Sequence, residues 1–112
     1  MVIIGPAIYI RCVSKLVRDR IPAVIRESGR EPEVTHVVGE LLRQALKDKL
    51  VEEAIELREA EQIEEELADV LEVVDALVEQ YGIDRKRLEA VKKEKYDRLG
   101  GFTHGHYLIT KG

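Results

Sequence analysis

The sequence predicts an all-α domain, and three observations support this fold class. The composition of the 112 residues is rich in Glu, Leu, Lys and Arg, with 36% charged residues, 4% aromatic residues and no Trp, a balance that favours helices over a β-sandwich. Residues 39 to 60 contain no Pro and no internal Gly. Apolar residues recur at helical spacing there and again over residues 63 to 81. A chain of this length forms one domain with a modest core.

The N-terminal third predicts a short strand and a short helix. Residues 7 to 13, AIYIRCV, are rich in β-branched and aromatic side chains, which suits a strand. The stretch KLVRDRIPAVIRESG follows, with Pro22 early and Gly29 at its end. Pro in the first turn and Gly just after the last turn are the expected asymmetry of a helix. We therefore expect a helix over about residues 18 to 28.

Two long helices follow, and each has an apolar stripe. The first runs from about 39 to 60, and its stripe includes Leu42, Leu46, Leu50 and Leu57. The second runs from about 63 to 81 and is closed by Gly82 as its C-terminal glycine. Its stripe consists of Ile63, Leu67, Val70, Leu71, Val74, Leu77 and Val78. Among these apolar positions, Leu50, Val70 and Val74 are expected in the core.

A last helix and a strand complete the predicted fold. Asp84 is the expected N-cap of a helix over residues 85 to 99, in which Leu88 and Val91 would be buried. The tail FTHGHYLIT alternates enough to form a short strand, and pairing it with residues 7 to 13 would give a small terminal β-ribbon. The predicted organisation is an N-terminal extension over 1–14 and a helical domain over 15–112.

Charge and cysteine content exclude several classes of partner. The net charge of −4 and isoelectric point near 5.4 argue against a nucleic acid polymer. The opening MVIIGPAIYI is only about half as long as a membrane-spanning helix and has no basic flank. The single Cys12 cannot form an intramolecular disulfide. We expect a cytoplasmic protein that does not bind membranes.

The stretch KLVEEAIELREAEQIEEELADVLEVV, residues 49 to 74, carries ten acidic side chains. If the two long helices form an antiparallel hairpin that turns near Glu61, facing positions have numbers that sum to about 122. Glu56 then faces Glu66, and Glu53 faces Asp69. Within each helix the two members are three residues apart and share one face. The register therefore brings four carboxylates together.

A metal ion and a solvated surface are the two explanations for this cluster. Four carboxylates at roughly 5 Å would repel one another where water is partly excluded. A hard divalent cation would cancel that repulsion, and Mg²⁺ prefers oxygen ligands. The alternative is an ordinary exposed acidic face. A di-iron site normally needs Glu-x-x-His motifs, and it is disfavoured because His36, His104 and His106 lie outside the two acidic helices.

Three motifs resemble those of a known family. Residues 49 to 56, KLVEEAIE, followed by ELADV at 66 to 70, resemble the EExxE…ExxD signature of the all-α nucleoside triphosphate pyrophosphohydrolases. These are the MazG-like enzymes, which are related to phosphoribosyl-ATP pyrophosphohydrolase. KLVRDRIP at 15 to 22 and EKYDRLGGF at 94 to 102 resemble the opening and closing segments of one MazG-like subgroup. The nine-residue gap between EExxE and ExxD is shorter than in many MazG-like domains, which implies a tight hairpin.

The resemblance implies a site and a reaction. Mg²⁺ or Mn²⁺ would be held by the ligand set Glu53, Glu56, Glu66 and Asp69. The implied catalytic residues are Glu53, through the metal, and Glu52, which would orient a water. Cations of the flanking motifs would bind the phosphates of a nucleoside triphosphate: Lys15, Arg18, Lys95 and Arg98. The reaction cleaves the α–β phosphoanhydride to give a nucleoside monophosphate and pyrophosphate, a house-cleaning activity in some relatives.

Two other functions and an oligomeric state remain to be considered. Phosphoribosyl-ATP pyrophosphohydrolase activity would use the same metal site, whereas a non-catalytic helical regulatory or interaction module would need no metal. The two long helices carry more apolar positions than one hairpin with short flanking helices can cover. The resemblance also implies oligomers with sites near subunit contacts. We therefore expect a homodimer or a higher homo-oligomer.

Overall fold

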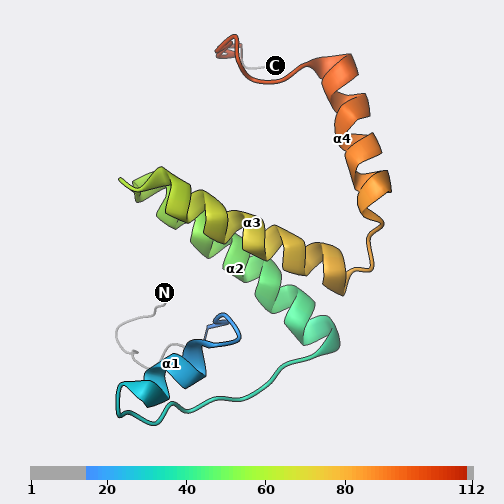
Figure 1. Ribbon diagram of the computed structural model, residues 1–112. Coiled ribbons are helices and arrows are strands. Elements are labelled where there is room, and N and C mark those ends of the chain that lie inside the picture. The colour runs from blue at the N-terminus through green and yellow to red at the C-terminus, as the bar shows by residue number, and fades with distance from the viewer. Residues whose placement is uncertain (1–14, 111–112) are drawn as a thin grey trace. The chain divides into compact units, whose positions relative to one another are not determined.

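The computed structural model describes residues 15–110 and is all-helical over that range (Figure 1). Its four helices are α1 (Ile21–Glu27), α2 (Gly39–Glu59), α3 (Ile63–Gln80) and α4 (Arg85–Leu99). The all-α prediction is therefore confirmed for the described chain. The predicted extension over 1–14, with its strand at 7–13 and Cys12, lies outside the described residues.

The helix ends follow the local signals in the sequence. Pro22 lies in the first turn of α1, and the backbone turns just after that helix at Gly29, with φ of 92°. Gly82, with φ of 61°, follows α3 as predicted. The Asp84 side chain accepts a hydrogen bond from the Lys86 backbone N–H at 3.0 Å, so it caps α4 as predicted. Short-range signals were sufficient to place these boundaries.

The chain divides into two compact units, one ending at Tyr81 and one beginning at Gly82. In the first unit, α2 and α3 pack against each other and are joined by residues 60–62 (Figure 1). Tyr81 adds a contact at the end of α3, because the Arg43 guanidinium and the Lys47 ammonium lie 5.7 and 5.3 Å from its ring centroid. The second unit contains α4 and the C-terminal tail.

The core of the α2–α3 pair is small. Among the described apolar residues, Leu46, Val73 and Val78 are buried. Leu50, Val70 and Val74 are half-buried on the same side of their helices. Part of the predicted stripe of α3 and several other apolar residues of α2 are exposed instead, because no other described element packs closely against them. These exposed residues are Leu41, Val51, Ile55, Ile63, Leu67 and Leu71.

Two predictions for the second unit are wrong. Leu88 is only half-buried and Val91 is 43% exposed, because within this unit α4 has no second helix to pack against. The tail over 102–110 forms no strand. Its large side chains Phe102, Tyr107, Leu108 and Ile109 are at least 82% exposed, and its expected partner strand lies outside the described residues.

No helix in the described part of the chain combines the length and apolar character needed to cross a membrane.

Candidate metal centre

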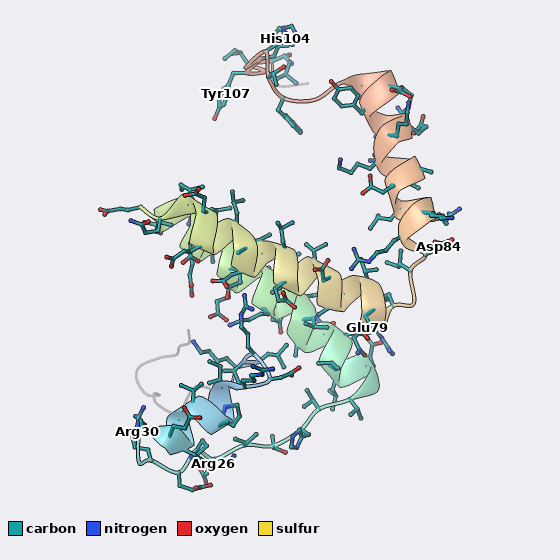
Figure 2. The ribbon with its side chains drawn as sticks, viewed as in Figure 1. Arg26, Arg30, Glu79, Asp84, His104 and Tyr107 are labelled. Carbon is teal, nitrogen blue, oxygen red and sulfur yellow. The ribbon has the colours of Figure 1, made fainter. Side chains whose placement is uncertain are left out.

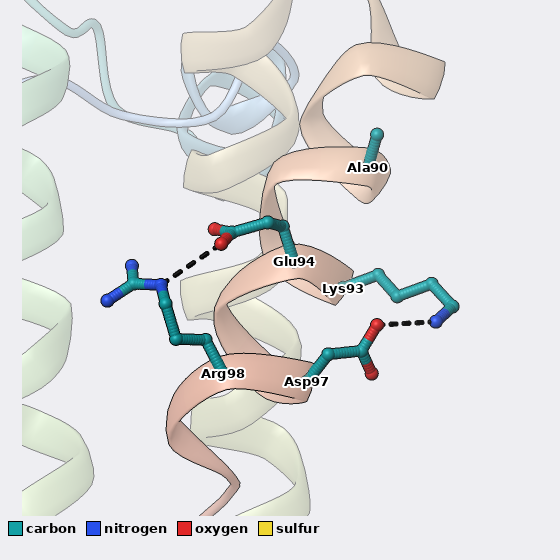
Figure 3. A pocket seen from close by; sticks show the side chains of 5 residues that line it. All are labelled: Ala90, Lys93, Glu94, Asp97 and Arg98. Carbon is teal, nitrogen blue, oxygen red and sulfur yellow. Dashed lines mark hydrogen bonds and ion pairs between the residues drawn. The ribbon is translucent and has the colours of Figure 1, made fainter.

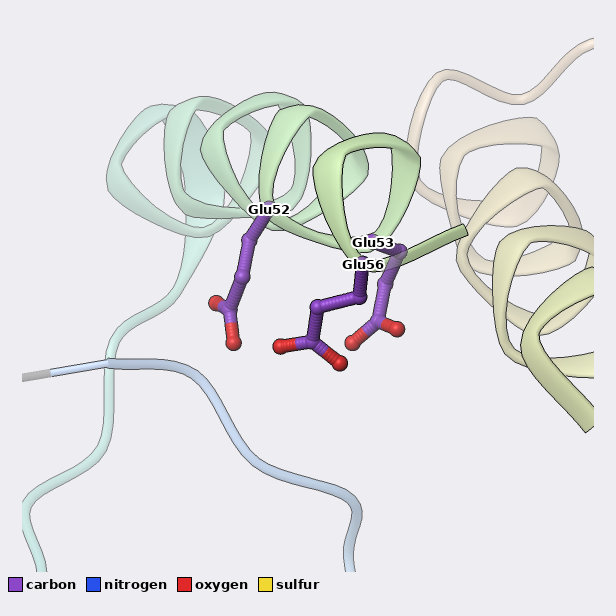
Figure 4. Close-up of side chains that lie close together, drawn as sticks. All are labelled: Glu52, Glu53 and Glu56. Atoms are coloured by element: carbon purple, nitrogen blue, oxygen red, sulfur yellow. The ribbon is translucent and has the colours of Figure 1, made fainter. Parts of the chain in front are cut away.

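The α2–α3 pair brings the predicted carboxylates together. Glu52, Glu53 and Glu56 form one group, in which carboxylate oxygens lie within 4.8 Å of one another, and their side chains point to the same side of α2 (Figure 4). Glu53, Glu66 and Asp69 form a second group with the same spacing, drawn from both helices. Because Glu53 belongs to both groups, it is the centre of the cluster.

Two oxygens of the cluster lack the partners that buried polar atoms normally have. Glu53 is only 6% exposed, and its Oε1 is buried without a hydrogen-bond donor. Oε1 of Glu66 is buried and unpartnered in the same way. A buried carboxylate oxygen without a donor is costly, and most such atoms in folded proteins are paired. A cation between α2 and α3 would satisfy both oxygens, so the donor set fits a hard divalent metal.

The titration of Glu66 reflects this crowding. Burial of its carboxyl group, followed by the negative charges of Asp69, Glu56, Glu53 and Glu65, raises the pKa of Glu66. A carboxyl group with a raised pKa binds its proton more tightly in the folded state than in the unfolded state. The pKa of Glu66 is therefore lower in the unfolded chain than in the folded protein. As the pH rises from the lower pKa through the higher one, ionisation of Glu66 reduces the free energy of unfolding. In the metal-free protein, ionised Glu66 is a source of instability.

Lys49 is the most enclosed cation of the site. Its Nζ lies 3.3 Å from Glu52 Oε2 and 3.3 Å from Glu53 Oε2, and its side chain is 16% exposed. Burial of the ammonium group lowers its pKa, but the hydrogen bonds and charges of Glu52 and Glu53 outweigh this effect, so the pKa of Lys49 is raised. Lys49 therefore stays charged and neutralises part of the cluster.

The segment before α1 contributes two further cations. Lys15 Nζ lies 3.6 Å from Glu52 Oε2. Arg18 donates a hydrogen bond from Nη2 to Asp69 Oδ1 at 2.6 Å. Both residues were predicted to bind substrate phosphates, and both lie at the carboxylate cluster. In each of these ion pairs at least one of the two side chains is more than a third exposed to solvent. Such ion pairs are weak, so a ligand could replace either partner.

The other two predicted phosphate-binding residues, Lys95 and Arg98, lie on α4 in the second unit. Arg98 Nε pairs there with Glu94 Oε2 at 3.0 Å. The Arg98–Glu94 pair and the Lys93–Asp97 pair line a concavity of about 400 Å³ on one side of α4 (Figure 3). The ionic groups of that concavity are already paired within the helix, so it offers no set of free groups. The phosphate-binding role of Lys95 and Arg98 stays a prediction.

A larger cavity, of about 460 Å³, adjoins the carboxylates in the first unit. Glu53, Asp69 and Lys49 line it, and so do residues 16–20. The rest of its lining comes from α2 and α3 toward Gln80: Leu42, Leu46, Glu72, Val73, Ala76 and Glu79. It therefore joins the carboxylate cluster to a region of mixed lining, in which Leu42, Leu46, Val73 and Ala76 are the apolar residues.

The described histidines do not belong to the candidate ligand groups. His36, His104 and His106 are all exposed, and neither metal-ligand group found among residues 15–110 contains a histidine. The rings of His104 and His106 stack with centroids 5.7 Å apart.

The structure thus gathers most of the residues predicted from the motifs. Around Glu53 lie Glu52, Glu56, Glu66, Asp69, Lys15 and Arg18. Sequence reasoning assigned no role to Lys49, although its spacing of three and four residues from Glu52 and Glu53 was a sufficient signal. It also missed the cavity, which has no motif. No family model, curated protein or solved structure matches the chain.

Proposed function

We propose that this protein is a Mg²⁺-dependent nucleoside triphosphate pyrophosphohydrolase. The observation that carries the proposal is the pair of orphaned oxygens, Glu53 Oε1 and Glu66 Oε1, within a cluster whose carboxylates lie within 4.8 Å. The EExxE…ExxD resemblance supports it independently, because it selects the same residues. In this proposal α2 and α3 form the central antiparallel hairpin of a MazG-like fold.

The roles of the residues follow from their positions. Glu53, Glu56, Glu66 and Asp69 would hold Mg²⁺, with Mn²⁺ as a substitute. Bound Mg²⁺ would neutralise the charge of the triphosphate and position its oxygens. Lys15 and Arg18 would then contact phosphate oxygens in place of their present carboxylate partners.

Glu52 is the proposed group that orients the attacking water. It lies within 4.8 Å of Glu53 and Glu56, and two ammonium groups, of Lys15 and Lys49, hold its carboxylate in place. Water adds across the α–β phosphoanhydride, the phosphorus–oxygen bond breaks, and a nucleoside monophosphate and pyrophosphate leave. A carboxylate beside the water would accept its proton as the new bond forms.

Pyrophosphate release and thermal stability together test the proposal. We expect saturating Mg²⁺ to stabilise the protein by about 2.7 kcal/mol when its concentration is 100 times its dissociation constant. A panel of common, deaminated and oxidised nucleoside triphosphates, together with phosphoribosyl-ATP, should then reveal pyrophosphate release that stops when EDTA is added.

The same measurements distinguish the alternatives. Turnover of phosphoribosyl-ATP alone would assign the phosphoribosyl-ATP pyrophosphohydrolase activity. A response to Mg²⁺ no larger than the response to the same ionic strength of NaCl, with no turnover of any substrate, would favour a non-catalytic helical module and contradict the proposal.

We also propose that the chain assembles at least as a homodimer. Val51 and Leu71 are 60% and 61% exposed, and Ile55, Ile63 and Leu67 add to the apolar surface of the α2–α3 pair. Exposed apolar surface on this scale is typical of association sites. Light scattering at micromolar concentration should give the mass of two or more chains, and Leu71→Glu should shift the mass toward one chain. A wild-type monomer would contradict this prediction.

A further inference from the structure

The cavity beside the carboxylates has two chemically different ends. Glu53 and Asp69 line the end at the proposed metal site. Leu46 is seven residues before Glu53 on α2, and Ala76 is seven residues after Asp69 on α3, which places each about 10 Å along its helix from the carboxylates. The volume of about 460 Å³ lies within the range of about 300–1,000 Å³ that small-molecule sites occupy.

Away from Glu53 and Asp69, the lining that α2 and α3 contribute is apolar at four positions, and Glu72 adds a carboxylate beside them. Leu42 and Leu46 contribute from α2, and Val73 and Ala76 contribute from α3. Ala76 is the smallest of these side chains, so the free space depends on its size. Four apolar side chains beside the negative charge of Glu72 favour a flat, weakly polar group such as a nucleobase over further phosphates or a free sugar phosphate.

Polar groups define the far end of the cavity. Gln80, the last residue of α3, lies one turn beyond Ala76 and therefore on the same face. Its amide can both donate and accept hydrogen bonds. Glu79 lies beside it at the end of α3 (Figure 2) and adds a negative charge. A phosphate would be repelled from this end, whereas the edge of a base would find hydrogen-bonding partners.

We propose that this cavity binds the nucleoside of the substrate, with Ala76 giving room for the base and Gln80 hydrogen-bonding to its edge. The inference rests on the proposed function and deepens it, because it fixes the direction of the nucleotide. The α-phosphate lies at Glu53 and Asp69, and the base lies toward Gln80. The β- and γ-phosphates therefore extend from the carboxylates away from the cavity, and Ala76 and Gln80 determine base specificity.

Binding of nucleoside monophosphates tests the cavity without catalysis. In calorimetric titrations with Mg²⁺ present, we expect wild type to bind at least one of AMP, CMP, GMP and UMP. Ala76→Leu should weaken that binding at least tenfold, because the larger side chain fills the space of the base. The affinity for inorganic pyrophosphate, which has no base, should change less than twofold.

Gln80→Leu is the second variant, and it keeps the test decisive if Ala76→Leu fails to fold. Loss of the amide should change the ratio of affinities among the four monophosphates by about tenfold or more, because an amide that pairs with one base edge discriminates against the others. Ala90→Leu on α4 and Gln44→Leu on an exposed part of α2 are the matched controls, and both should bind as wild type does.

The outcomes separate this inference from the proposed function. If the wild type releases pyrophosphate from nucleotides but Gln80→Leu keeps both its affinities and its base preference, the cavity assignment is overturned and the function stands. If the wild type binds no monophosphate and pyrophosphate alone competes with the substrate, the cavity assignment is likewise overturned. If monophosphates bind as predicted but no triphosphate is hydrolysed, the hydrolase proposal fails and the binding site stands.

Discussion

Replacing Glu53 by Gln should abolish the stabilisation of the protein by Mg²⁺ and reduce turnover at least about 100-fold. Glu53 belongs to both carboxylate groups, so its loss removes a ligand that no other residue duplicates. Without metal, Glu53→Gln should unfold at the same temperature as wild type or higher, because a buried charge with an orphaned oxygen is replaced by a neutral amide. Melting temperatures with EDTA and with Mg²⁺, beside initial rates, measure both effects.

Two further variants serve as comparisons. Glu59→Gln is the control, because Glu59 is exposed and pairs with Arg58, which is exposed too, and its effect should stay within about 0.5 kcal/mol. Asp69→Asn should also lose the Mg²⁺ response. Since Asp69 accepts the hydrogen bond from Arg18 at 2.6 Å, its metal-free form should gain less stability than Glu53→Gln. Equal and small effects at positions 53, 59 and 69 would eliminate the metal site.

Replacing Lys49 by Met should destabilise the metal-free protein by about 2 kcal/mol and strengthen Mg²⁺ binding. The Lys49 ammonium lies 3.3 Å from both Glu52 and Glu53, and the Glu53 side chain is 8% exposed. Its removal leaves two like charges facing each other with little water. A metal would then compete with one cation fewer at Glu52 and Glu53, so its dissociation constant should fall. Chemical denaturation in EDTA and titration with Mg²⁺ measure the two effects.

Lys93→Met is the matched control for this variant. Lys93 pairs with Asp97 at 2.7 Å, with the same four-residue spacing as Lys49 and Glu53, but both side chains are well exposed. Exposed pairs of this kind contribute only about 0.3–0.5 kcal/mol. If Lys49→Met and Lys93→Met lower the free energy of unfolding by the same small amount and leave Mg²⁺ binding unchanged, Lys49 has no special role in the cluster.

Local and periodic signals predicted much of this protein. The N-cap Asp84, the terminal Gly82 and the long run without Pro placed the helices, because each acts through a few neighbouring residues. The carboxylate cluster was also predictable. The predicted turn near Glu61 determined which positions were expected to face each other, and the structure brings Glu53, Glu66 and Asp69 together.

Features that depend on distant packing could not be predicted in the same way. Periodicity assigned Leu67 and Leu71 to a buried stripe, but it cannot say whether another element is present to cover them, and both are exposed. The prediction that Val91 on α4 is buried was wrong for the same reason. The cavity is lined by residues of both α2 and α3, among them Ala76, and it appears only when the two helices are placed side by side.

The three-residue connection over 60–62 has a consequence for how sequences of this kind can change in length. Each residue of an α-helix turns the chain by about 100°. One residue inserted between Glu53 and Glu59, or in the first turn of α3, would rotate part of the cluster away from the rest. Insertions after Gly82, where the second unit begins, do not change the directions in which these carboxylates point from α2 and α3. Evolutionary insertions and deletions should therefore be tolerated beyond Tyr81 and eliminated within the helical stretches from Glu53 to Glu59 and from Ile63 to Asp69.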